Sequence, residues 1–163
     1  MEFREMRRKR QQLSNEECVD ILTRATSGVL SLVGDGGYPY GVPVSYVYAG
    51  GKIFLHSAVE GHKVDAMRNN AKCSFCVVEQ DDVRPLEFTT YFRSVIAFGK
   101  ITVVEDDNEK LSALQMLGRR YSPNEEERLT HEIEKSFGHL LVLRIDIEHM
   151  TGKEAIELVR ARQ

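Results

Sequence analysis

Glycine-rich turns separate three apolar segments early in the chain, and this pattern limits the possible fold more than any other feature. The segments are residues 28–33 (GVLSLV), 38–49 (YPYGVPVSYVYA) and 52–57 (KIFLHS). Glycine adopts positive φ without steric cost, so the turns at 34–37 and 50–51 favour β-hairpins. We expect three consecutive antiparallel strands. Because Pro39 and Pro43 cannot donate to a ladder, the middle strand is expected to be bulged or at a sheet edge.

Further strand-like segments follow, with helices between them. Residues 72–78 and 139–150 are predicted to be strands, and 79–87 a loop by composition. Residues 88–105 are rich in β-branched and aromatic side chains, and we expect a long strand bent near Gly99.

Helix-capping patterns predict four helices before the last strand. Helices are expected after Ser14, which begins a capping box, over 62–69, after Asp106, and after Ser122. Strand patterns without βαβ alternation indicate a mainly β (α+β) fold with about six antiparallel strands. We expect one domain over residues 1–150 and a tail over 151–163 that forms a short helix.

Composition excludes several classes of function. The chain has 163 residues and a net charge of −3, so nucleic-acid binding is not expected, and the basic residues 7–10 are interpreted as a solvated tail. No apolar run approaches the ~20 residues that cross a bilayer, and the charged N-terminus is unlike a signal peptide. We therefore expect a cytoplasmic protein that does not bind membranes.

The three cysteines indicate neither a disulfide framework nor a metal site. Cys73 and Cys76 have the spacing of a redox pair, but they lie in a strand-like segment rather than at a helix N-terminus. No second Cys/His pair has the spacing of zinc ligands, so no metal is expected.

Residues 54–63 (FLHSAVEGHK) form the first candidate site. On the strand, Ser57 shares a face with apolar residues and His56 lies on the other face. Gly61 precedes the expected helix, and Lys63 falls in its first turn, where a cation opposes the helix dipole. A phosphate bound to the helix amides, Ser57 and Lys63 would resolve this conflict. An exposed lysine on a solvated turn remains the alternative.

Residues 88–95 form a second candidate cluster. Tyr91, Arg93 and Val95 share one face of the long strand, and Phe92 and Ser94 share the other. An arginine in an apolar strand requires an anionic partner or a path to water. Part of a ligand site and an ordinary ion pair at the barrel rim are equally open explanations.

Taken together, these segments resemble the pyridoxamine 5′-phosphate oxidase-like FMN-binding split barrels, most closely the nitroimidazole-resistance flavoproteins. The matching stretches, in order, are MRRKRQQLSNEE, YPYGVPVSYVY, IFLHSAVEGHKVDAMRNN, FTTYFRSVIAFGKITVVED and HMTGKEA. The resemblance implies a six-stranded antiparallel split β-barrel with peripheral helices, assembled as a homodimer with FMN at the interface. Many nitroimidazole-resistance members end soon after the last motif, whereas this chain continues with EAIELVRARQ.

The resemblance also implies a set of FMN-binding residues. The isoalloxazine ring would be lined by Pro43, Val44 and Ser45. The path from the ring edge to the phosphate would be lined by His56, Ser57, Ala58, His62 and Lys63. The pocket would be closed by Tyr91, Ser94 and Val95, and the loop 151–153 would reach it.

The implied activity is electron transfer from a reduced nicotinamide to a small planar acceptor such as a nitroaromatic. His56 is the candidate catalytic residue, as a hydrogen-bond donor or proton source, and a histidine with only a packing role is the alternative. A flavin store or sensor without turnover, and a barrel that binds haem or a deazaflavin, also remain open. True pyridoxamine-phosphate oxidase activity ranks lower, because no further basic residues for a substrate phosphate are evident. Ser57 and Ser94 lack a nucleophile elbow, which argues against hydrolysis.

Overall fold

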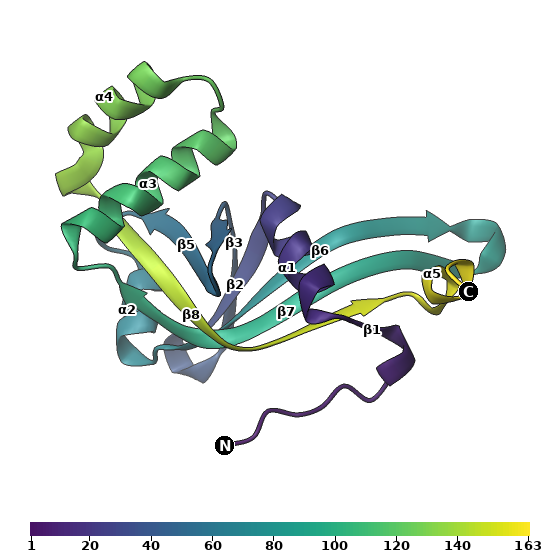
Figure 1. Cartoon of the computed structure of the whole chain (residues 1–163). Helices are drawn as coiled ribbons and strands as arrows, with labels where there is room; N and C mark the ends of the chain where they lie inside the picture. The colour runs from purple at the N-terminus through teal and green to yellow at the C-terminus, as the bar shows by residue number, and fades with distance from the viewer.

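One antiparallel sheet organises the molecule (Figure 1). The computed structural model describes residues Met1–Gln163. The strands run in the order β3-β2-β6-β7-β8-β5-β4, and β1 also pairs with β8. Their bounds are β1 (Gln12–Leu13), β2 (Gly28–Val33), β3 (Pro39–Val44), β4 (Val47–Ala49), β5 (Lys52–Ser57), β6 (Lys72–Arg84), β7 (Thr89–Val103) and β8 (Leu141–Glu154). The predicted fold class is confirmed, although the sheet has eight strands rather than six.

Five helices lie around this sheet. They are α1 (Asn15–Arg24), α2 (His62–Asn69), α3 (Asp107–Tyr121), α4 (Glu126–Ser136) and α5 (Ile156–Ala161). The main core fills the inside of the curved sheet, with α1 and α2 contributing to it, and a smaller core lies between the sheet and the α3–α4 pair. No helix combines the length and the apolar character that crossing a bilayer requires.

The expected single strand over residues 38–49 is wrong. It is broken at Ser45 and Tyr46, so that β3 pairs with β2 at one end of the sheet and β4 pairs with β5 at the other. Tyr46 is held at this break by contacts with distant parts of the chain. Its ring is fully buried, its hydroxyl donates to the Leu22 carbonyl at 2.6 Å, and its N–H donates to the Tyr121 hydroxyl at 2.8 Å. The barrel is therefore split between two consecutive strands, and β3 is an edge strand as its prolines predict.

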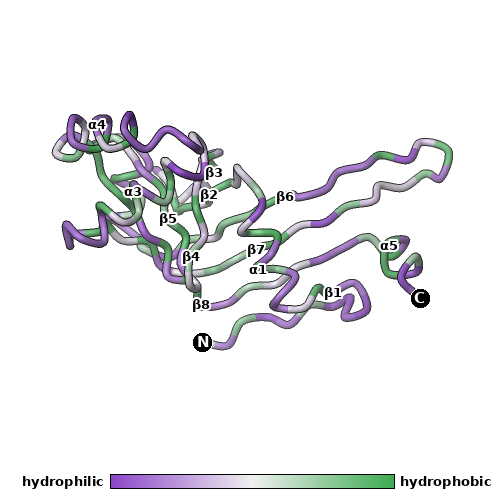
Figure 2. The backbone as a smooth tube through the Cα atoms, turned by 45° about the horizontal axis from the view of Figure 1, so that its top comes forward, coloured by the Kyte–Doolittle hydropathy of each residue, from purple (hydrophilic) through white to green (hydrophobic).

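The expected loop over residues 79–87 is also mostly strand. β6 continues to Arg84 and forms, with β7, a hairpin arm that projects from the barrel (Figure 1). The outer half of β6 is hydrophilic (Figure 2), so it lacks the alternation that identifies a half-buried strand. The pairing shifts between Val78 and Gln80, which leaves Glu79 as a bulge where the arm leaves the barrel.

Most of the predicted helix starts and the predicted bend are confirmed. Ser14 and Glu17 form the capping box at 3.1 and 2.8 Å, and Asp106 caps α3. The pairing of β7 with β8 shifts at Gly99, where a Cβ would lie 2.2 Å from the Asp146 carbonyl oxygen. The start expected at Ser122 is wrong. That residue ends α3 with a bond to Gly118, and α4 begins at Glu126.

The tail and the cysteines also have defined places. β8 continues through Glu154, past the expected start of the tail, and α5 is the short helix expected there. All three cysteines are free. Cys73 is buried on β6, and this burial raises its thiol pKa to about 12, which agrees with a structural role.

Candidate functional site

The N-terminus of α2 forms the first part of the candidate site. Gly61 precedes the helix with φ 135°, a conformation that L side chains rarely adopt, and no side chain caps the first turn. The Ser57 side chain is 7% exposed, and its hydroxyl donates to the Ala58 carbonyl at 3.0 Å. Helix-start amides without a capping side chain are suited to hold an anion.

Lys63 adds a positive charge to this turn. Its side chain is half-buried, and this burial lowers its pKa. No carboxylate of the chain forms a salt bridge with it. A fully solvated lysine would not lose hydration in this way. A bound phosphate would compensate this partly buried charge, and the anion site at Lys63 stays a prediction.

His62 is fixed by the turn between β2 and β3. Its ring stacks on the half-buried Tyr40 with centroids 4.0 Å apart, and its Nε2 accepts the Asp35 N–H at 3.3 Å. An Nε2 that accepts a hydrogen bond places the proton of the neutral ring on Nδ1. The Asp35 carboxylate lies 3.8 Å from Nε2. Sequence patterns gave no sign of Tyr40 and Asp35, which are distant from His62 in the chain.

Ser45 and His56 lie in a second place, which we call the helix groove. It has a volume of about 460 Å³ and lies between the end of β5 and the α3–α4 pair. Its apolar wall consists of Leu114, Leu117, Leu129, Ile133, Leu140 and Tyr121. His56 is exposed and lies on the opposite face of β5 from Ser57, since neighbouring residues of a strand alternate. The predicted His56–Lys63 path therefore passes from one face of β5 to the other.

The β3 residues lie at the free edge of the sheet. Pro43 is exposed and pairs with Val29, while Val44 is half-buried and pairs with Gly28. Both directly precede the break at Ser45. They are thus continuous with the helix groove along the chain.

The predicted residues of β7 are not brought to α2 within one chain. Tyr91 lies on the arm, where its hydroxyl donates to Glu87 at 2.7 Å. Ile101, whose N–H bonds to Ala71 just after α2, follows ten residues later, about 30 Å along a strand. Ser94 pairs with Val78 and Lys153, and Val95 is fully buried in the barrel core.

Arg93 has the anionic partner that its position requires. Its guanidinium donates to the Glu154 carboxylate at 3.1 and 3.2 Å, and Glu154 is only 1% exposed. Arg162, beyond α5, contacts the same carboxylate and also Glu17 at 3.0 Å. The ion-pair explanation for Arg93 is confirmed. The C-terminal tail lies against the arm and not against α2, and Glu157 of α5 accepts a hydrogen bond from the Thr89 hydroxyl (Figure 1).

An exposed apolar face covers the outside of the sheet. Val29, Cys76 and Ile96 are directly paired across β2, β6 and β7, and Val29 and Ile96 are 39% and 40% exposed. Phe98 and Val78 extend this surface, which we call the outer face, with exposures of 39% and 63%. Contiguous apolar surface of this kind commonly marks an interface.

The open antiparallel sheet, curved around one core and broken between β3 and β4, has the architecture of a split-barrel protein. The family model described as pyridoxamine 5′-phosphate oxidase matches residues 14–154, and the chain belongs to this family.

Solved structures agree with this assignment. A FAD-binding protein of Mesorhizobium loti is 26% identical, with a TM-score of 0.67, over 89% of this chain and 97% of that one. A candidate 5-nitroimidazole antibiotic resistance protein of Bacteroides thetaiotaomicron is 21% identical, with a TM-score of 0.71, over 88% and 86%. The FAD and heme binding protein of Mycobacterium smegmatis is 23% identical, with a TM-score of 0.74, over 94% and 80%. The two similarities under 25% identity establish the fold alone.

Proposed function

We propose that the protein is a homodimeric FMN-binding oxidoreductase that transfers electrons from a reduced nicotinamide to small planar acceptors such as nitroaromatics. The observation that carries this proposal is Lys63, a half-buried cation without a counter-ion at an uncapped helix start. Membership of the family and the 26% identity to a FAD-binding protein support a flavin as the ligand whose phosphate Lys63 would bind.

The residues at α2 fit a phosphate monoester. Lys63 would neutralise part of its charge, the first-turn amides would donate to its oxygens, and the Ser57 hydroxyl could turn from Ala58 to donate as well. The Asp35 carboxylate, which is 93% exposed, stands beside His62 at the edge of this site. A second phosphate extending toward Asp35 would be repelled, which favours FMN over FAD.

The outer face supports the homodimer. An apolar sheet surface shared by β2, β6 and β7 would be buried by a second copy through a two-fold interface. The arms project beyond the barrel (Figure 1), so a partner's Tyr91 and Ser94 could approach a site that they do not reach within their own chain.

The chemistry divides between the cofactor and the chain. When bound, FMN supplies hydride acceptance from the nicotinamide and electron donation to the acceptor. Lys63 holds the phosphate, and His62 is kept in one tautomer by the turn that carries Asp35. The His56 side chain has no hydrogen-bond partner within the chain, so it is free to donate a hydrogen bond or a proton to a ligand in the helix groove.

A visible absorption spectrum of the purified protein tests the proposal, followed by mass spectrometry of the compound released by heat. Two flavin bands and the mass of FMN are the expected result, with bleaching by reduced nicotinamide and recovery on adding a nitroaromatic. A Soret band would indicate that the protein binds haem instead of a flavin. Flavin bands that reduced nicotinamide never bleaches would indicate a store or sensor. A colourless protein that takes up no added flavin would refute the proposal.

A further inference from the structure

Hydrogen bonds and close packing join the walls of the helix groove to one another. The Tyr121 hydroxyl accepts the Tyr46 N–H at 2.8 Å and lies 2.9 Å from the Tyr46 carbonyl oxygen. These bonds hold the end of α3 against the break that exposes Ser45. On the other side, the Leu129 side chain of α4 packs against α3 at Gly118, where an added Cβ would lie 2.1 Å from the Leu129 Cδ1 atom.

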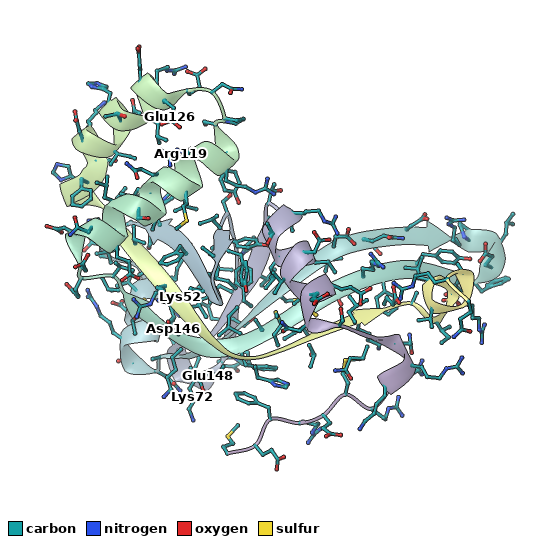
Figure 3. All side chains as sticks on the ribbon, viewed as in Figure 1. Lys52, Lys72, Arg119, Glu126, Asp146 and Glu148 are labelled. Atoms are coloured by element: carbon teal, nitrogen blue, oxygen red, sulfur yellow. The ribbon has the colours of Figure 1, made fainter.

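A salt bridge also joins α3 and α4. Arg119 on α3 and Glu126 on α4 point toward each other (Figure 3), and their closest atoms are 2.7 Å apart. The groove has a volume of about 460 Å³, within the ~300–1,000 Å³ range typical of small-molecule sites.

The lining combines an apolar wall with few polar groups. The apolar wall, which includes Leu117, Leu129 and Ile133, could contact a flat hydrocarbon ring. Ile133 is the one buried residue of α4. His56 lines the groove, and its side chain has no hydrogen-bond partner within the chain. A ligand with an apolar body and one hydrogen-bonding group matches this combination.

Glu132 gives the groove a negative charge. Two nearby carboxylates have arginine partners, since Glu126 contacts Arg119 and Glu125 contacts Arg128. Glu132 lines the groove and forms no salt bridge. Its negative charge would attract a cationic ligand and repel an anionic one.

We propose that the helix groove binds a planar aromatic ligand that is neutral or cationic, and that Glu132 excludes aromatic carboxylates. This inference rests on the proposed function for one point only, namely that the ligand serves as the electron acceptor. Binding itself requires no flavin.

Three probes of the same shape test the inference: benzamidine, benzamide and benzoate. Each is titrated into the purified protein while the methyl resonances of Leu117, Leu129 and Ile133 are followed by NMR. We expect saturable shifts with benzamidine and benzamide, and benzoate binding weaker than benzamidine by on the order of tenfold or more. Glu132→Gln should reduce this difference to about threefold or less. Glu134→Gln, on the same helix but outside the groove, is the matched control and should preserve the full difference.

Leu117→Trp fills the groove and should abolish the benzamide shift at Ile133. The inference is overturned if no probe shifts these methyls saturably, if benzoate binds as well as benzamidine, or if both glutamate variants behave alike. Flavin absorbance of the same samples separates the two proposals. Bound FMN without groove binding refutes only the inference, whereas groove binding in a protein that takes up no flavin refutes only the proposed function.

Discussion

Replacing Lys63 by methionine should separate binding from stability. The change keeps most of the apolar stem and removes the charge. A charge-assisted bond to phosphate contributes roughly 1.5–3 kcal/mol, and each 1.4 kcal/mol is about tenfold, so the Kd for FMN should rise about 10- to 150-fold. Quenching of flavin fluorescence during titration measures this. Lys100→Met, on an exposed position of β7, is the matched control and should leave the Kd unchanged.

The same substitution should not destabilise the flavin-free protein. Burial lowers the pKa of Lys63 below its ordinary 10.5, so the folded state holds this proton less tightly than the unfolded state. Its contribution to stability therefore rises with pH, from the lowered folded pKa up to 10.5. Lys63→Met should remove this rise and leave the urea midpoint at pH 7 equal or higher. An unchanged Kd for FMN, or a clear loss of stability at pH 7, would refute the role of Lys63 as an unsatisfied cation.

Three further substitutions test other parts of the structure. Ile96→Asp on the outer face should convert the proposed dimer to a monomer in light scattering, whereas Val83→Asp on the arm should not; a dimer in both would move the interface elsewhere. Tyr121→Phe should lower the free energy of unfolding by about 1–3 kcal/mol, because the buried Tyr46 N–H loses its acceptor; no change in urea denaturation would contradict this. Glu154→Gln should cost about 1–3 kcal/mol, less than for a fully buried pair because its arginine partners can reach water, and a neutral result would show that this pair contributes nothing.

Local signals predicted much of the fold correctly. The capping box at Ser14, the helix over 62–69 and the bend at Gly99 depend on neighbouring residues, and all three are confirmed. The break at Tyr46 was missed because the contacts that hold this residue include the Tyr121 hydroxyl, 75 residues away. The arm was missed because its outer residues meet water on both faces, so no hydrophobic alternation marks the strand.

The same contrast between neighbouring and distant residues applies to the candidate site. Ser57, Gly61 and Lys63 are close in sequence, and the conflict between a lysine and a helix start was visible in the residues themselves. The helix groove was not predicted, since it forms only when α3 and α4 pack against the end of β5. The roles of Tyr91, Ser94 and Val95 stay predictions, because they depend on a second copy of the chain.

The most direct test of the central claim compares FMN with riboflavin, which has the same ring system and no phosphate. If the start of α2 holds the phosphate, the protein should bind FMN at least about tenfold more tightly than riboflavin in parallel fluorescence titrations. Equal affinity for the two compounds would contradict the claim that Lys63 and the α2 amides form a phosphate site.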